Sequence, residues 1–292
     1  MKKYFESLSL VELNSTFYNY PQGRTVEGWR EKAPEKFEFT VKAHQDISHK
    51  AKLKADETCL QAFERIIQIC KTLHSKILLI QTPGSFRSDR LAEAERFFRK
   101  VNRRNLTLVW ETRGSSWEIE DVYKKLRQTA ETLDVTHVTD PLRAMPAHTG
   151  RAAYFRLHGL GERMYYYQHS DSELKKLEQS IRPFERESKE VYVLFNNLTM
   201  FDDALRFKQY MSVGTFPRIT CSYGLASVRE VAAKTRYPAS TSLLMKKLGW
   251  KLVEAEEGKQ VRLASLLDGL PTRTYNSAEE LVDTIKSVKK MD

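Results

Sequence analysis

The sequence predicts an α/β protein, and three observations along its 292 residues lead to that fold class. Apolar runs of strand length recur between residue 9 and residue 197. Amphipathic segments of helix length lie between these runs, and each run ends in polar or charged residues. Near-continuous apolar strands that alternate with helices are typical of a parallel sheet with helices packed outside it.

Seven strands are expected, and each is an apolar run. The runs are residues 9–13, 37–43, 76–82, 106–112, 135–140, 152–159 and 191–197. Residues 57–73 and 90–104 show the helical pattern between them. Seven strand–helix units within roughly 200 residues fit a (β/α)8 TIM-like barrel better than an open sheet. The alternative is a doubly wound fold, but its usual glycine-rich phosphate loop after the first strand is absent from this sequence.

The composition argues against a membrane protein. The chain is 41% hydrophobic, yet no stretch approaches the ~18 apolar residues of a membrane helix. No charged-then-apolar signal segment is visible at the start. Three cysteines without metal-ligand spacing suggest reduced thiols. We therefore expect a cytoplasmic protein with no membrane partner.

The overall charge suggests an anionic partner. The formal net charge is +10 and the pI is about 9.3. This excess of positive charge favours DNA, RNA or a phosphorylated small molecule as the ligand. An equally simple explanation is a charged surface that keeps the protein soluble.

The strand ends carry the candidate site. Glu12 and Asn14 are two residues apart, so their side chains point to the same side of the strand. In a barrel all strand ends meet on one face, where the active site lies. The residues concerned are Glu12, Asn14, Lys42, Gln81, Glu111, Arg113, Asp140, Arg156, His158 and Asn196. The alternative is that they fill the barrel as a satisfied polar network.

These residue types suggest acid–base chemistry on an anionic substrate. Carboxylates and a histidine that titrates near neutral pH can transfer protons. The catalytic candidates are Glu12, Glu111, Asp140 and His158. Arginine and lysine bind phosphate or carboxylate groups. The cationic candidates are Lys42, Arg113 and Arg156. Spacing along the strands predicts that Glu111 pairs with Arg113 and that Arg156 pairs with His158.

The loops after the strands add aromatic and basic candidates. Tyr18, Trp117 and Tyr165 would lie around the mouth of the barrel, where aromatic rings can stack on bases or sugars. The alternative is ordinary packing of the loops on the barrel. His49, among several lysines, would extend the positive field, unless that run is only a solvated helix start.

Several of these stretches together resemble a known family. The stretches VELNSTFYNYP, FTVKA, LLIQTPGSF, VWETRGSSW, YFRLHG, YYYQHSDSEL and VYVLFNN stand in the order typical of the YecE-like family, domain of unknown function 72. The resemblance implies a TIM barrel distantly similar to the xylose isomerase and endonuclease IV group. It also implies that the polar residues named above occupy family positions.

The resemblance implies a first barrel strand ahead of the segment KKYFESL, and this sequence begins inside that segment. Either the start of the sequence is assigned too late, or another strand closes the barrel, because a missing strand would leave open sheet edges. Residues 216–224 are a candidate for such a replacement strand. The barrel is expected over residues 1–212. Residues 213–292 are expected to form a small helical or α+β extension.

Two interpretations of the extension stand side by side. A helix, a turn, a second helix and two short strands around EEGK are typical of a winged helix-turn-helix that binds DNA. Alternatively, the pattern of Thr235, Arg236 and Ser240 recurs as Thr272, Arg273 and Ser277, which indicates a duplicated helical module. Ser277 with Glu280 predicts a capping box.

The leading functional hypothesis is action on, or binding of, nucleic acid or another phosphate-bearing substrate, as in a phosphodiester hydrolase. The alternatives are a sugar-phosphate isomerase or lyase, and a non-catalytic nucleic-acid or anion-binding module. Endonuclease IV-like barrels hold several metal ions. Here one Mg²⁺ or Mn²⁺ ion on the carboxylates is the most that the sequence supports, and no cofactor is firmly implied.

Overall fold

The computed structural model describes residues 2–187 and 189–289. The chain divides into two compact units. Unit 1 comprises residues 1–157 and 180–194, and unit 2 comprises residues 158–179 and 195–292. The part of the chain that is described contains no helix long and apolar enough to cross a membrane.

Unit 1 is built on parallel strands, as expected. A five-stranded parallel sheet has the order β1-β2-β3-β4-β5, and a second sheet pairs β6 with β7. A parallel bridge between Thr139 and Phe155 joins the end of β5 to β6. The strands are β1 (Leu10–Leu13), β2 (Glu38–Lys42), β3 (Ile77–Gln81), β4 (Thr107–Glu111), β5 (Val135–Val138), β6 (Ala152–Leu157) and β7 (Glu190–Phe195). All seven expected strands are confirmed, and the α/β class with them.

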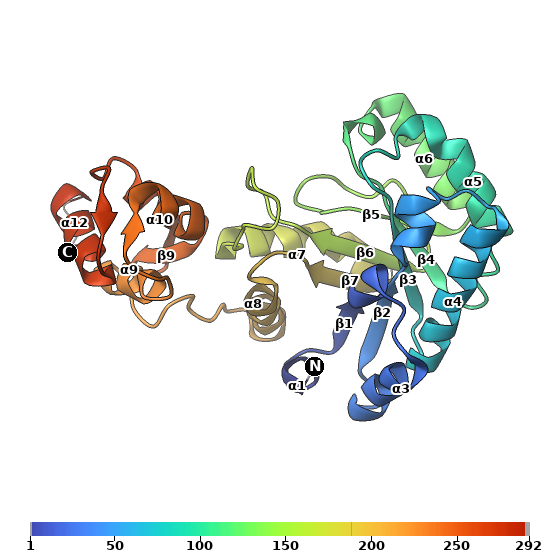
Figure 1. The fold of residues 1–292 in the computed structure, drawn as a ribbon, viewed down its shortest axis with the longest axis horizontal. Coiled ribbons are helices and arrows are strands. Elements are labelled where there is room, and N and C mark those ends of the chain that lie inside the picture. The colour runs from blue at the N-terminus through green and yellow to red at the C-terminus, as the bar shows by residue number, and fades with distance from the viewer. Residues whose placement is uncertain (1, 188, 290–292) are drawn as a thin grey trace. The chain divides into compact units, whose positions relative to one another are not determined.

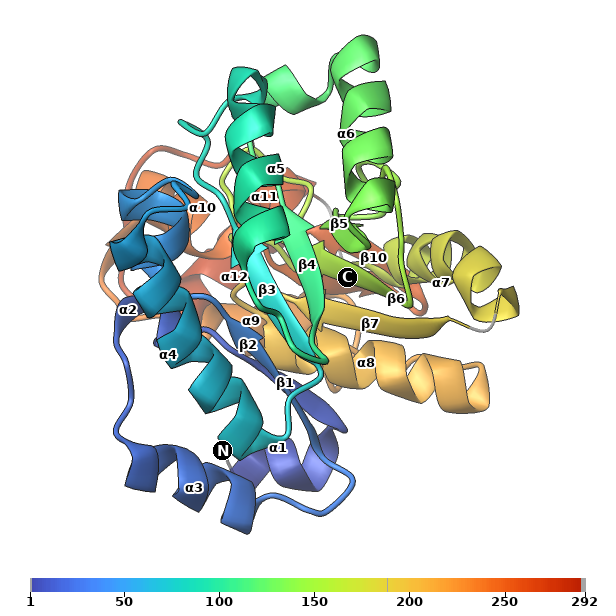
Figure 2. The same cartoon turned by 90° about the vertical axis from the view of Figure 1, so that its right-hand side faces the viewer.

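Helices alternate with these strands along the chain. They are α1 (Lys2–Ser7), α2 (Ser15–Tyr18), α3 (Gly23–Lys32), the π-helix η1 (Asp46–Lys50), α4 (Glu57–Leu73), η2 (Ser88–Arg90), α5 (Leu91–Lys100), η3 (Ser115–Trp117), α6 (Glu120–Thr132) and α7 (Asp171–Arg186). Asp56 accepts the amide of Cys59 and so begins α4. Helices α4, α5 and α6 lie on the outer side of the sheet (Figures 1 and 2).

Successive side chains of a strand point to opposite sides, and strands β2 to β6 are buried on both faces. On the outer face Leu78, Leu108 and Trp110 pack in the same core as helices α4 and α5. The opposite faces form a second core, which we call the inner cluster. Its members are Ile77, Leu79, Val109, Val138, Ala152, Tyr154, Tyr192 and Leu194, with Leu10 packed against them. The first strand, β1, and the last strand, β7, therefore contribute to one core.

The last strand of unit 1 is also linked to β2 and β3 by polar contacts. The hydroxyl of Tyr192 in β7 donates to Glu38 in β2 at 2.9 Å. Lys76, just before β3, lies 3.7 Å from Glu190 at the start of β7. These contacts hold the amino ends of the strands together.

The expectation that residues 216–224 supply a replacement strand is wrong. This segment forms bends and turns, and its partners lie in unit 2. The side chain of Arg218 binds Glu254 at 2.8 Å, and the amide of Gly224 donates to the carbonyl of Glu254 at 2.7 Å. The segment is therefore tied to strand β9 of unit 2 rather than to the sheet of unit 1.

The later part of unit 2 follows the predicted order of helix, turn, helix and two strands. The elements are α8 (Met200–Val213), α9 (Leu225–Ala232), β8 (Ala239–Ser240), α10 (Thr241–Leu248), β9 (Leu252–Glu256), β10 (Lys259–Arg262), α11 (Leu263–Leu267), β11 (Thr274–Tyr275) and α12 (Ala278–Lys289). Strands β9 and β10 are antiparallel. A core from α9, α10, α11 and α12 holds these elements together.

The two halves of the sequence repeat occupy equivalent places. Ser240 accepts the amide of Leu243 at the start of α10, and Ser277 accepts the amide of Glu280 at the start of α12. The two short strands before these helices, β8 and β11, pair with each other. The capping box is only half formed, because Glu280 accepts the amide of Asn276 instead of that of Ser277.

Candidate functional site

A buried arginine gathers two carboxylates at the strand ends of unit 1. The Nε atom of Arg156 lies 3.0 Å from Oε2 of Glu12, and its Nη2 lies 2.7 Å from Oε1 of the same carboxylate. Its Nη1 donates to Glu111 and lies 3.4 Å from Oε1 of Gln81. The Arg156 side chain has no solvent exposure. One guanidinium thus joins β6 to β1, β3 and β4.

The Glu12 carboxylate is held by more than the arginine. Tyr154 donates its hydroxyl to Oε2 at 2.8 Å, and Asn14 donates to Oε1 at 3.0 Å. The Tyr154 hydroxyl also lies 2.8 Å from Oγ1 of Thr40. A carboxylate with this many donors offers few free lone pairs for other work.

Glu111 is held in a similar way. Its Oε1 accepts from Nε of Arg113 at 2.9 Å, and its Oε2 accepts from Arg156. The predicted pair of Glu111 and Arg113 is therefore confirmed. We call Glu12, Asn14, Gln81, Glu111, Arg113, Tyr154 and Arg156 the Arg156 cluster.

The strands bring these residues together because the side-chain period of a strand is two. Each residue lies two positions after a member of the inner cluster or a residue packed on it: Glu12 after Leu10, Gln81 after Leu79, Glu111 after Val109, and Arg156 after Tyr154. The polar residues therefore form the next layer above the apolar layer, at the carboxyl ends of the strands.

The charges of this cluster are balanced at close range. Burial lowers the pKa of Arg156, but the carboxylates of Glu12 and Glu111 outweigh it and hold that pKa above its ordinary value. Arg156 is thus always charged. Buried ions of this kind are stable only when paired and hydrogen-bonded.

Lys42 at the end of β2 stands apart from these pairs. Its side chain is largely buried, with 9% of the residue exposed. Its Nζ lies 4.3 Å from the ring centroid of Phe17. Within the described ranges, no carboxylate lies at ion-pair distance from it. Burial, together with the nearby positive charge of Arg156, lowers the pKa of Lys42 to about 8, although Glu12 and Glu111 act in the opposite direction.

His49 belongs to the same neighbourhood. Its ring packs edge-on against Phe17 at 4.8 Å, and its Nδ1 lies 2.9 Å from Oγ of Ser48. Burial lowers the pKa of His49, and the charges of Lys42 and Arg113 lower it further. His49 is therefore a neutral imidazole at neutral pH.

Three further predicted residues of unit 1 are Trp117, Tyr18 and Asp140. Trp117 is only 3% exposed, stacks on Phe86 and donates its indole N–H to the carbonyl of that residue. This ring is part of the outer core, so the expectation that Trp117 contacts a ligand is corrected. Tyr18 is 64% exposed. Asp140 is buried, and its Oδ1 accepts the amide of Leu142, which shapes the turn after β5.

Three further predicted residues belong to unit 2. Asn196 Nδ2 lies 3.3 Å from Nδ1 of His158, and Tyr165 packs edge-on against the His158 ring at 5.6 Å. These three residues contact one another. The hydrogen bonds that define the Arg156 cluster run from Arg156 to Glu12, Asn14, Gln81 and Glu111, and the pairing of Arg156 with His158 stays a prediction.

Two residues of the site were missed in the sequence. Tyr154 and Thr40 orient the Glu12 carboxylate through a chain of two hydrogen bonds. The signal that would have found Tyr154 is its position two residues before Arg156 on the same strand face. The same spacing relates Thr40 to Lys42.

The donor set does not suit the divalent metal ion that was considered from the sequence. Among residues 2–187 and 189–289, no three His, Cys, Asp or Glu side chains gather so that they could hold a metal ion. The carboxylates of Glu12 and Glu111 already accept from Arg156 and Arg113. A Mg²⁺ or Mn²⁺ ion beside them would face two guanidinium charges, so these residues do not fit a resident divalent ion.

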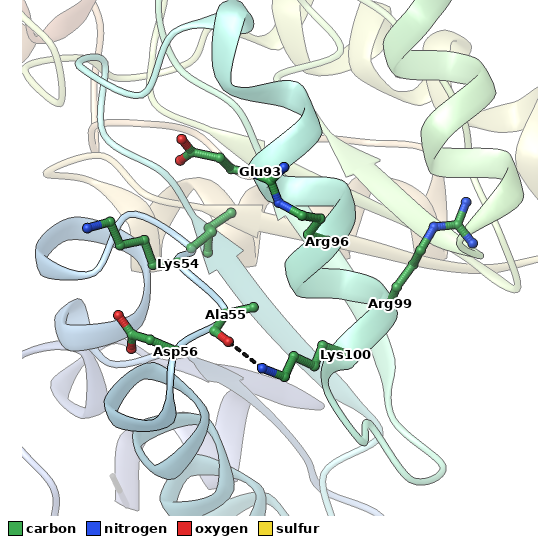
Figure 3. Close-up of a pocket in the computed structure, with 8 residues that line it drawn as sticks. Lys54, Ala55, Asp56, Glu93, Arg96, Arg99 and Lys100 are labelled. Atoms are coloured by element: carbon green, nitrogen blue, oxygen red, sulfur yellow. Dashed lines mark hydrogen bonds between the residues drawn. The ribbon is translucent and has the colours of Figure 1, made fainter.

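A separate pocket of about 720 Å³ opens on the outer side of unit 1, between the start of α4 and helix α5 (Figure 3). Four cations line it: Lys54, Arg96, Arg99 and Lys100. The Nζ of Lys100 donates to the carbonyl of Ala55 at 2.7 Å. The acids of the pocket have structural roles, since Asp56 caps α4 and Glu93 binds Arg90.

The parallel sheet, its outer helices and the charged cluster at its strand ends define an α/β protein with a buried polar layer above an apolar core. A family model described as "Protein of unknown function DUF72" matches residues 1–216, and the chain belongs to this family. The resemblance seen in the sequence is thereby confirmed. A second model, "Family of unknown function (DUF5789)", matches residues 223–289.

Relatives and solved structures agree with this assignment. The chain is 24% identical over 246 residues to the UPF0759 protein YunF of Bacillus subtilis (strain 168), covering 73% of this chain and 86% of that protein. Two crystal structures of a DUF72 family protein from Enterococcus faecalis V583 are similar in fold. One has a TM-score of 0.59 at 24% identity and covers 72% of this chain and 92% of that one. The other has a TM-score of 0.56 at 21% identity, with 75% and 90% covered.

Replacing Arg156 with methionine should destabilise unit 1 by about 3–5 kcal/mol, because two buried carboxylates lose their shared counter-charge. Urea unfolding at pH 7 would measure this loss. Arg96→Met, an exposed change on α5, should stay within about 0.5 kcal/mol. A loss below about 1 kcal/mol for the Arg156 variant would contradict this role of the ion pairs.

Lys42→Met should raise the free energy of unfolding at pH 7 by up to about 3 kcal/mol. The pKa of Lys42 is lowered from 10.5 to about 8 in the folded protein. Below pH 8 both states hold the proton, and the folded state bears the full cost of the buried charge. Between pH 8 and 10.5 the unfolded state binds more protons, so the stability of the natural chain rises with pH. The advantage of the variant should therefore fall to about 1 kcal/mol at pH 9.5. A difference that does not change with pH would refute it.

Proposed function

We propose that unit 1 is a TIM-like barrel that binds a small phosphate- or carboxylate-bearing substrate at its strand ends and acts on it. The inner cluster supports the barrel, since Leu10 of β1 and Tyr192 of β7 share one core. The polar layer above that core supports the location of the site, because barrel enzymes place their sites at the carboxyl ends of the strands.

The observation that carries this proposal is the unpaired ammonium group of Lys42. Arg156 has its charge matched by Glu12 and Glu111, so it has little left to offer an anion. Lys42 keeps its positive charge below pH 8 without an ion-pair partner in the described residues. An anionic group beside Nζ would supply the missing counter-charge and relieve the cost of burial.

The sequence suggested that Glu12 and Glu111 transfer protons, but their hydrogen bonds favour another role. Glu12 and Glu111 are occupied by arginine, so we infer that they position Arg156 and orient the site rather than abstract protons. Proton transfer then falls to Lys42, whose pKa is lowered to about 8, and to the imidazole of His49, whose pKa is lowered by burial. This pattern suits an isomerase or lyase acting on a sugar phosphate or a related acid.

Residues 213–292 we infer to be an extension built from a duplicated helical module. The repeated order of short strand and serine-capped helix supports this reading. The winged helix-turn-helix has weaker support. Strand β8, from the first half of the repeat, pairs with β11 from the second half, as a duplicated module would predict.

Calorimetric titration with inorganic phosphate and with ribose 5-phosphate tests the small-anion proposal. Both should bind the natural chain, and Lys42→Gln should weaken binding about tenfold, as expected for one charge-assisted contact. Lys36→Gln, an exposed lysine before β2, is the matched control and should leave binding unchanged. Equal affinity in the natural chain and in Lys42→Gln would overturn the proposal.

Nucleic acid is the second candidate, and the outer pocket together with the net charge of +10 favours it. Lys54 and Arg96 are exposed there and form no ion pair within the described parts of the chain (Figure 3). A row of such cations can follow a phosphate backbone. This candidate uses the outer surface of unit 1 instead of the strand ends.

Fluorescence anisotropy with labelled single-stranded DNA, duplex DNA, abasic duplex and RNA would test this second candidate. Contact with three phosphates should lower the affinity about 40-fold between 50 and 200 mM salt. Lys54→Glu with Arg96→Glu should weaken binding of every form, whereas Lys36→Glu should have a much smaller effect. Weak binding without a salt slope would remove nucleic acid from consideration.

A further inference from the structure

The amine of Lys42 has the surroundings of a nucleophile as well as those of an anchoring charge. A lysine becomes nucleophilic when it is desolvated or lies beside another cation, because both conditions favour the neutral amine. Lys42 meets both conditions. It is largely buried against Phe17, and the arginines Arg156 and Arg113 act on it electrostatically.

The position of Lys42 on the strand directs its amine to the inside of the strand layer. Thr40, two residues earlier in β2, contacts the hydroxyl of Tyr154 in the inner cluster. Lys42 therefore lies on the same face, one layer closer to the strand ends. The residue keeps 9% of its surface exposed.

We propose that Lys42 forms an imine with the carbonyl carbon of an aldehyde or ketone substrate. This inference rests on the proposed function, which supplies the anionic group of the substrate. It adds the group of the substrate that reacts, a carbonyl. The substrate class is then a small carbonyl compound that carries a phosphate or carboxylate group.

The step balances without an oxidant or a metal. The lone pair of neutral Nζ attacks the carbonyl carbon, and the π electrons of C=O move to oxygen as the C–N bond forms. A proton passes from nitrogen to that oxygen and gives a carbinolamine. Protonation of the hydroxyl and its loss as water leave a protonated C=N bond, so one amine, one carbonyl and one proton give one protonated imine and one water.

The ionisation of Lys42 suits this step. The groups that act on it are Arg156, Glu12, Glu111, Arg113 and His49. With its pKa lowered from 10.5 to about 8, the neutral fraction of Lys42 at pH 7 is roughly 300 times that of an ordinary lysine. An exposed lysine lacks this advantage, so reaction at Lys42 should be selective.

An imine on Lys42 would also make further reactions possible at the neighbouring carbon of the substrate. Protonated C=N withdraws electrons from the neighbouring carbon, which makes removal of a proton or cleavage of a carbon–carbon bond easier. His49, neutral and packed against the same Phe17 ring, is placed to accept such a proton. The reaction class is then a lyase or an isomerase.

Borohydride trapping tests the imine directly. The full-length protein would be incubated with glyceraldehyde 3-phosphate, dihydroxyacetone phosphate or pyruvate, reduced with borohydride, and mapped by peptide mass spectrometry. One reduced adduct should appear on Lys42, at least tenfold above any other lysine at pH 7. Its yield before saturation should increase with pH up to about 8. Lys36→Arg, a change at an exposed lysine before β2, should leave the adduct unchanged.

Lys42→Arg separates this inference from the proposed function, because it keeps the charge and removes the nucleophile. Retained phosphate binding with loss of the adduct supports both. Phosphate binding by the natural chain without any adduct on Lys42 overturns the imine and leaves the proposed function standing. An adduct on Lys42 without phosphate binding supports the imine and overturns the anion-binding proposal. Adducts spread over surface lysines in both proteins overturn the imine.

Discussion

The double ion pair of Arg156 is the interaction on which the strand ends of unit 1 depend. Three charges are withdrawn from water there, and their mutual attraction offsets the desolvation only while the geometry is kept. The carboxylates need further donors to complete their hydrogen bonding, which Tyr154, Asn14 and Arg113 supply. The guanidinium is planar and permanently charged, so it fixes both carboxylates at once. Strands β1, β4 and β6 are therefore held in one arrangement.

Because this charged layer is stable, the protein can tolerate a destabilising buried charge, that of Lys42, beside it. Lys42 is buried without a matching carboxylate in the described residues, and this costs stability. Sites that bind or react commonly carry such a cost, because the property that makes a group unstable when it is alone makes it useful when a ligand arrives. The stabilising pairs and the reactive amine are thus complementary parts of one layer.

The sequence predicts the strands and their polar ends, because strands buried on both faces leave continuous apolar runs and a period of two. It also predicts the local pair of Glu111 and Arg113. It does not predict that Arg156 pairs with Glu12, which lies 144 residues away, since no local pattern specifies which strands meet. Trp117 shows a second limit. An aromatic residue after a strand looks the same in sequence whether its ring faces a ligand or, as here, the core.

The inner cluster has a consequence for the way the protein is made. Its members run from Ile77 to Leu194, and Leu10 packs against them. A ribosome releases the chain from its amino end, so β1 and β2 emerge long before β7 exists. Contacts between residues so far apart in sequence form slowly, because a large loop must close first. The core that β1 shares with β7 therefore cannot close until about residue 194 has left the ribosome, and apolar surface that is exposed until then favours aggregation.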